Sequence, residues 1–156
     1  MSETLKKPLN FSIGLVEHTF ISFELSEYAK NNTKSIGFDK YEFTFEFNMQ
    51  VNAKERQIKL LFNSNLLVKE EQLTIELSSL NLSCLFKIIN FDEVIKIDSN
   101  NRMLTPNALI QTINTIALGS ARGMYAMALA ATPYSNAVLP LVDPKTLVPK
   151  DNQVIL

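Results

Sequence analysis

Apolar and polar residues alternate strictly along residues 41–51. Every second side chain of a β-strand points to the same face, so this pattern predicts a strand with one face in water. Its apolar positions form a row of aromatic side chains that ends in methionine and valine: Tyr41, Phe43, Phe45, Phe47, Met49 and Val51.

Shorter alternations predict three more strands, over about residues 9–25, 57–68 and 72–90. Polar turns at 52–55 and 69–71 separate the second, third and fourth strands. In the fourth strand the apolar residues change from odd-numbered to even-numbered positions near Ser78-Ser79, a parity flip. One extra residue in a β-bulge accounts for the flip, and a break into two shorter strands is the alternative. The expected sheet, over about 9–91, is an antiparallel meander or a close relative.

A long helix is predicted over about residues 106–131. Thr105 fits the N-cap position, Pro106 the first helical position, and Pro133 disfavours helical geometry just before it. A short turn follows at 143–148. The sequence therefore predicts an α+β fold in a single domain over 1–156, with a four-stranded antiparallel sheet followed by one long helix.

This helix carries almost no charge: Arg122 is the only charged residue from Met103 to Val142. A helix on a single sheet needs one apolar stripe and normally turns a charged face to water. We therefore expect its second side to pack against another subunit; the alternative is a monomer with a neutral polar helix face. The residues expected in the oligomer helix are Ile113, Ala117, Gly119, Gly123 and Met127.

Composition narrows the class of protein. The net charge of −1 argues against a dedicated nucleic-acid binder, which is usually strongly basic. The lone Cys84 excludes an intramolecular disulfide and fits a reducing compartment. The N-terminus lacks the uninterrupted apolar run of a secretory signal, which leads us to expect a cytoplasmic protein. The uncharged stretch 123–142 contains prolines and polar residues, so stable membrane insertion is not expected.

Catalytic chemistry has little support in the sequence. His18 is the only histidine, there is no clustered metal-ligand set, and the four glycines form no phosphate loop. We therefore expect no enzyme, no metal and no cofactor.

The aromatic row is then either core or a groove for extended unfolded chains, since aromatic and Met side chains tolerate many apolar sequences. In the second interpretation the client-binding residues are Tyr41, Phe43, Phe45, Phe47 and Met49.

Five short motifs, in order along 9–148, resemble those of the SecB-type export chaperones. Ile-Ser-Phe-Glu at 21–24 is similar to the end of that family's first strand, and Leu-Phe-Lys-Ile at 85–88 to the end of its last strand. Leu-Thr-Pro-Asn-Ala at 104–108 resembles the opening of its main helix. Arg-Gly at 122–123 and Leu-Pro-Leu-Val-Asp at 139–143 resemble motifs late in that helix and after it.

The resemblance implies an ATP-independent holdase that binds unfolded preproteins in apolar grooves as a homotetramer, a dimer of dimers with its helices inside. It implies Glu24 and Leu77 as candidates for docking the SecA motor. A second branch of the family serves as dedicated chaperones of antitoxins. Two alternatives stay open: an adaptor that binds one specific partner on the same fold, and a carrier of a small apolar ligand.

Overall fold

The computed structural model describes residues 10–148 and 153–154. Its main elements are four strands and one long helix: β1 (Ile13–Leu25), β2 (Tyr41–Asn52), β3 (Gln57–Glu70), β4 (Leu73–Ile88) and α3 (Asn107–Leu129). Short elements connect or flank them: α1 (Glu27–Asn31), η1 (Phe38–Lys40), α2 (Phe91–Val94), β5 (Lys96–Ile97), β6 (Met103–Leu104), η2 (Pro144–Leu147) and β7 (Gln153–Val154). The fold is α+β, as the sequence predicts.

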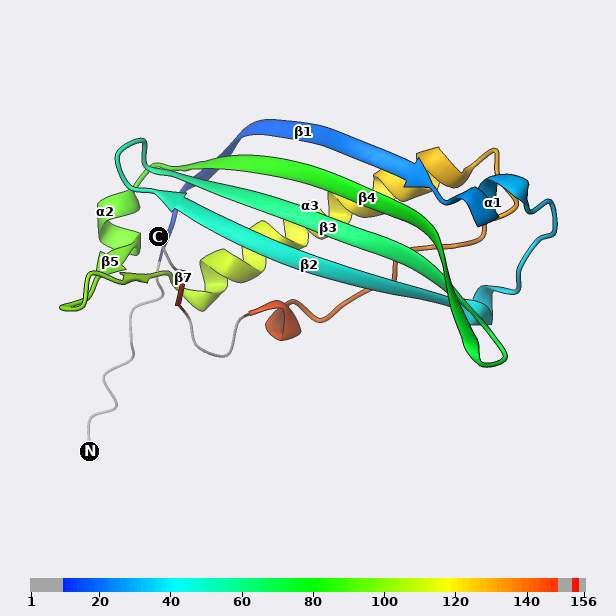
Figure 1. Ribbon diagram of the computed structural model, residues 1–156. Coiled ribbons are helices and arrows are strands. Elements are labelled where there is room, and N and C mark those ends of the chain that lie inside the picture. The colour runs from blue at the N-terminus through cyan, green and yellow to red at the C-terminus, as the bar shows by residue number, and fades with distance from the viewer. Residues whose placement is uncertain (1–9, 149–152, 155–156) are drawn as a thin grey trace.

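The four long strands form one antiparallel sheet in the order β1-β4-β3-β2. Strands β2, β3 and β4 are a meander, whereas β1 pairs with β4 and not with β2, its successor in the chain (Figure 1). The sheet is thus a close relative of a meander. This order leaves β2 at one edge of the sheet and β1 at the other.

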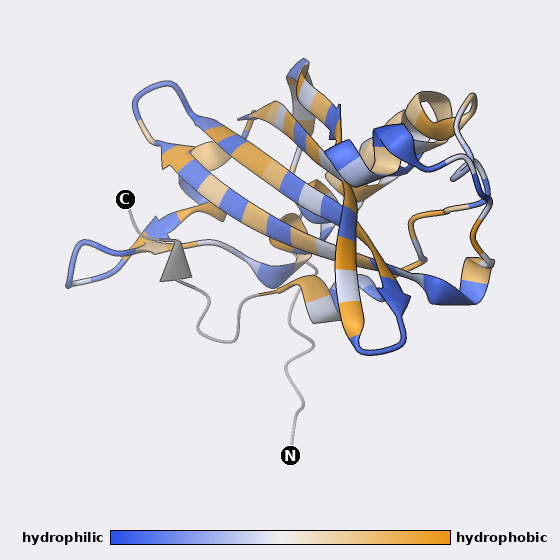
Figure 2. Cartoon of the chain, turned by 45° about the vertical axis from the view of Figure 1, so that its right-hand side comes forward, coloured by the Kyte–Doolittle hydropathy of each residue, from blue (hydrophilic) through white to orange (hydrophobic). Residues whose placement is uncertain are grey.

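Helix α3 lies across one face of the sheet, against β3 and β4 (Figure 1). Hydrophobic and hydrophilic residues alternate along the strands of the sheet (Figure 2). In β3 and β4 nearly every second residue is buried, and most of these buried residues are apolar. Tyr125 of α3 is fully buried between the helix and the sheet. Its ring packs edge-to-face against Phe23 of β1 and Phe43 of β2. Most of the other large, fully buried side chains belong to β3 and β4, among them Phe62, Leu66, Leu80, Leu82 and Phe86.

The parity flip in β4 is a β-bulge, because β4 is one continuous strand. Leu66 of β3 pairs with Ser78 and Leu67 pairs with Glu76, so Leu77 is the extra residue. Both Leu77 and Ser78 are fully buried. Strand β1 has two similar irregularities, which leave Val16 and Ile21 out of register and half exposed.

Several boundaries differ from the prediction by a few residues: α3 ends at Leu129 and not at residue 131, and β4 ends at Ile88 and not at residue 90. Helix α3 begins one residue later, with Pro106 at the N-cap position and no side-chain capping bond. Thr105 is therefore not the cap; its buried hydroxyl has no hydrogen-bond partner within the described residues. Strand β1 begins at Ile13, and residue 9 of the predicted strand lies outside the described part of the chain.

Candidate functional site

The aromatic row of β2 faces the core but is not fully covered. Its five predicted client-binding residues are all half-buried and pack against the core: Tyr41, Phe43, Phe45, Phe47 and Met49. The ring centroids of Phe43 and Tyr125 lie 5.2 Å apart, and those of Phe47 and Phe62 lie 5.1 Å apart. Such edge and tilted contacts fix the rings in place. The row therefore packs against the core and keeps an accessible margin.

The chain after α3 forms a second wall beside this margin. We call residues 132–142 the strap: it turns back from the end of α3 and runs in an extended path on the same side of the sheet (Figure 1). Tyr134 anchors it, because its buried hydroxyl donates to the carbonyl oxygen of Ala29 at 3.1 Å and accepts from Asn32 Nδ2 at 3.1 Å. The strap is thereby fixed to the segment between β1 and β2.

A second anchor joins the strap to the beginning of β2. The hydroxyl of Tyr41 donates to Asn136 Oδ1 at 2.8 Å, and Asn136 Nδ2 donates to the carbonyl oxygen of Ile36 at 2.9 Å. Desolvation and the neighbouring Tyr134 raise the pKa of Tyr41, so its hydroxyl keeps the proton that it donates.

Between the strap and β2 lies an open hollow of about 420 Å³. It is lined by one amide and five apolar or aromatic residues, none of them charged: Phe38, Tyr41, Phe43, Asn136, Val138 and Pro140. Two large apolar side chains of its lining face water, Phe38 at 79% and Val138 at 68% exposed, and the next residue of the strap after Pro140, Leu141, is 89% exposed. This concentration of exposed apolar surface at an uncharged hollow is typical of an interaction site. We call the hollow and its two walls the strap groove.

Most of the residues that line the strap groove are not indicated by the sequence patterns. Tyr41 and Phe43 were predicted from alternation, whereas Phe38, Val138 and Pro140 were not. The uncharged run 133–142 was the available signal, but local sequence does not say which strand such a segment lies beside. Only the return of the chain after α3 brings it next to β2.

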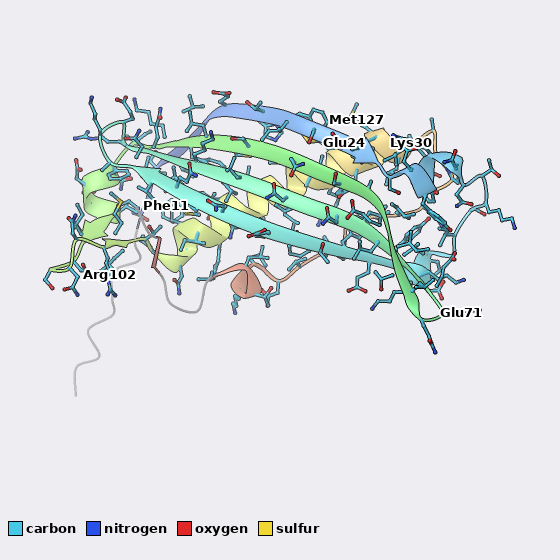
Figure 3. All side chains as sticks on the ribbon, in the orientation of Figure 1. Phe11, Glu24, Lys30, Glu71, Arg102 and Met127 are labelled. Carbon is cyan, nitrogen blue, oxygen red and sulfur yellow. The ribbon has the colours of Figure 1, made fainter. Side chains whose placement is uncertain are left out.

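The two residues predicted to dock the motor differ in their exposure to solvent. Glu24 is exposed near the end of β1, opposite Ser79 of β4 (Figure 3). Leu77 is fully buried. The prediction is therefore corrected for Leu77, because this residue follows Ile75 by two positions and shares the strand face that packs against the core.

The residues predicted for the oligomer helix likewise fall into a buried group and an exposed group. Ile113 and Ala117 are fully buried against the sheet of their own chain, which corrects the expectation that they face another subunit. Gly119 and Gly123 are exposed, and Met127 is 83% exposed (Figure 3). A Cβ built on either glycine meets nothing within 4 Å. The packing of this chain therefore does not require the two glycines.

The candidates for chemistry lie apart from the strap groove. His18 is exposed on β1, opposite Cys84 of β4. Cys84 is fully buried, and desolvation raises the pKa of its thiol to about 11, so the thiol stays protonated at neutral pH. Across the described ranges, no three His, Cys, Asp or Glu residues are grouped in a way that could hold a metal ion. No helix in these ranges has the length and hydropathy needed to cross a membrane.

Comparison with solved structures finds a known protein with this fold. The SecB-like chaperone Rv1957 of Mycobacterium tuberculosis, solved in complex with a ChAD peptide from the antitoxin HigA1, superposes with a TM-score of 0.57 at 10% identity. The match covers 83% of this chain and 90% of that one. A protein of unknown function from Streptococcus agalactiae, at 8% identity over 86% of this chain and 100% of that one, has a TM-score of 0.29, too low to indicate a shared fold. No family model and no curated protein matches the sequence.

Proposed function

We propose that the protein is an ATP-independent molecular chaperone, a holdase that binds unfolded polypeptides in the strap groove. The observation that carries the proposal is the uncharged hollow between β2 and the strap, which is lined by exposed Phe38 and Val138 and followed along the strap by exposed Leu141. The fold shared with a SecB-like chaperone that was solved with a bound peptide supports it.

The walls of the groove favour an extended client. Strand β2 is an edge strand of its sheet, and within the described residues its backbone pairs with β3 on one side only. A chain in the groove can add main-chain hydrogen bonds to this edge while its apolar side chains enter the hollow. Main-chain recognition with apolar contacts is independent of exact sequence, as a holdase requires. No reactive pair of side chains lies at the groove, and the proposed activity is binding without catalysis or cofactor.

A stoichiometric assay tests the proposal. A reduced, unfolded client is diluted with and without the protein, in the absence of nucleotide, and its aggregation is followed by light scattering. We expect suppression at near-equal subunit ratios. A triple variant with Phe38→Ser, Val138→Ser and Leu141→Ser removes only exposed apolar groups and should suppress aggregation at least several-fold less well.

The matched control removes exposed apolar groups away from the groove. Ile89→Ser and Ile97→Ser change side chains that are 66% and 58% exposed near α2 and β5. We expect this control to suppress aggregation like the unmodified protein. Equal loss in both variants would point to general surface hydrophobicity, and no suppression by the unmodified protein would contradict the holdase proposal.

The second candidate is a dedicated chaperone or adaptor for one partner, such as an antitoxin. The observation that favours it is the bound antitoxin peptide of the similar structure. The breadth of binding separates the two functions: a general holdase suppresses aggregation of several unrelated clients, whereas a dedicated chaperone protects one.

We also propose that the protein assembles with copies of itself through α3, as a dimer of dimers. The outward side of the helix is uncharged and exposes mostly small residues: Ala108, Thr115, Gly119, Gly123, Ala126, Met127 and Ala130. Small residues allow helices to approach closely, and burial of this side requires no desolvation of charge. Docking to SecA has weaker support, because only Glu24 of its predicted pair is on the surface.

A further inference from the structure

Arg122 has an unusual environment for a charged residue. It is half-buried on α3 and, within the described residues, forms no ion pair with a carboxylate. Its guanidinium instead donates to two successive main-chain carbonyl oxygens, from Nε to Leu139 at 3.1 Å and from Nη2 to Pro140 at 3.0 Å. A planar fork of donors suits such a pair of acceptors, which a lysine ammonium does not match.

These two carbonyl groups belong to the strap wall of the groove. Pro140 lines the hollow together with Val138, while the side chain of Leu139 between them is fully buried. Proline at 140 restricts Leu139 to an extended conformation and provides no N–H of its own. The strap at this point is therefore extended without the hydrogen-bond ladder of a sheet.

The other anchors of the strap lie on either side of this stretch. Tyr134 and Asn136 fix its beginning, and Asn114 Nδ2 donates to the carbonyl oxygen of Leu147 beyond its end, at 2.8 Å. For residues 138–142, the hydrogen bonds within the described chain come from Arg122 alone. Beside the buried side chain of Leu139, the hydrogen bonds of Arg122 thus tie the strap to α3 where the strap borders the groove.

We propose that Arg122 is a positioning residue for client binding, which fixes the width of the strap groove by holding residues 139–140. This inference rests on the proposed holdase function. Without the two bonds, residues 138–142 would sample wider positions, and a client would lose one wall of its site. Preorganisation of that wall should act mainly on the dissociation rate.

The test measures two quantities on the same variants: the rate at which a client is released, and the protection of the strap amides from hydrogen exchange. The client probe is fluorescently labelled, reduced and carboxymethylated α-lactalbumin, a permanently unfolded chain. In Arg122→Met we expect it to dissociate about tenfold faster, from the loss of two charge-assisted hydrogen bonds. Hydrogen exchange of the amides in residues 138–142 should accelerate, while exchange in β3 and β4 stays unchanged.

Two further variants separate positioning from charge and stability. Arg122→Lys keeps the charge and should restore only part of the slow release; it also serves if Arg122→Met fails to fold. Arg102→Met makes the same substitution on an exposed arginine at the end of the molecule near β5 and should change nothing (Figure 3).

The outcomes distinguish this inference from the proposed function. Faster release together with faster strap exchange supports the positioning role. Unchanged release overturns it, whether or not strap exchange accelerates, and so does full rescue by Arg122→Lys. If the unmodified protein binds no unfolded probe at all, the holdase proposal fails and the positioning role fails with it. Hydrogen exchange of the strap amides would then report only on the hydrogen bonds between Arg122 and the strap.

Discussion

At the scale of single residues, polar groups of the buried layer explain how the helix is placed on the sheet. The hydroxyl of Tyr125 donates to the carbonyl oxygen of Ser64 at 3.0 Å and lies 3.1 Å from its hydroxyl oxygen. A buried hydroxyl without a partner is costly, so these bonds specify one position of α3 over β3. Apolar contacts alone are less directional. The sequence pattern includes Tyr125 in the predicted helix but does not indicate its partner on the sheet.

We expect Tyr125→Phe to lower the free energy of unfolding by about 1–2 kcal/mol, because it removes a buried hydrogen bond and keeps the ring. Urea denaturation followed by circular dichroism measures the change. Tyr28→Phe is the matched control: Tyr28 is exposed on α1, and its hydroxyl makes no hydrogen bond within the described residues. Equal stabilities of the unmodified protein and Tyr125→Phe would show that the bond contributes nothing.

Alkaline pH should destabilise the fold through two buried groups. Desolvation raises the pKa of Tyr125 from 10.0 to about 12 and the pKa of Cys84 from 9.0 to about 11. The unfolded chain therefore loses these protons at lower pH than the folded chain, and rising pH favours unfolding. We expect the stability contributed by these groups to be complete below pH 9 and to be lost progressively between pH 9 and 12.

Urea midpoints measured from pH 8 to 12 test this dependence. Cys84→Ala should flatten the early part of the decline and Tyr125→Phe the later part, each relative to its own value at pH 8. A decline that is identical in all three proteins would assign the alkaline loss to other groups.

At the scale of elements, the alternation of residues predicted the strands, and the parity flip predicted the bulge in β4. The pattern did not show that the extra residue is Leu77, because register depends on the partner strand β3. It also missed α1, although Ser26 caps that helix by accepting from the amide of Ala29 at 3.1 Å. A helix of five residues has too little periodicity to be recognised.

The exposed side of α3 gives a prediction at this scale. Gly123→Leu places a large side chain where the single chain has open space, so the subunit should fold normally. If α3 packs closely against another copy, the leucine should shift the protein toward a smaller assembly in analytical ultracentrifugation. Asn100→Leu, on the exposed turn between β5 and β6, is the control. An unchanged assembly in Gly123→Leu would exclude close packing at this glycine.

At the scale of the whole molecule, the strap groove is a product of tertiary arrangement. The sequence indicated an α+β fold and the aromatic row, because both follow from local periodicity. It did not indicate that β1 pairs with β4, which leaves β2 at an edge, or that residues 136–140 return beside it. Strand order and the apposition of distant segments depend on long-range packing. For this reason the sequence does not indicate Phe38 and Val138 as groove residues, and the resemblance offers Leu77 for docking although its side chain is buried.

Photocrosslinking tests the proposed client site most directly, because it locates a bound unfolded client on the surface of the protein. Leu141→benzoylphenylalanine and Ile97→benzoylphenylalanine place a photocrosslinker at two exposed apolar sites, one at the strap and one on β5. Each protein is mixed with reduced and carboxymethylated α-lactalbumin, without nucleotide, and irradiated. We expect a crosslinked adduct from position 141 and little or none from position 97. Adducts of equal yield from both positions, or none from position 141, would contradict a client site at the strap groove.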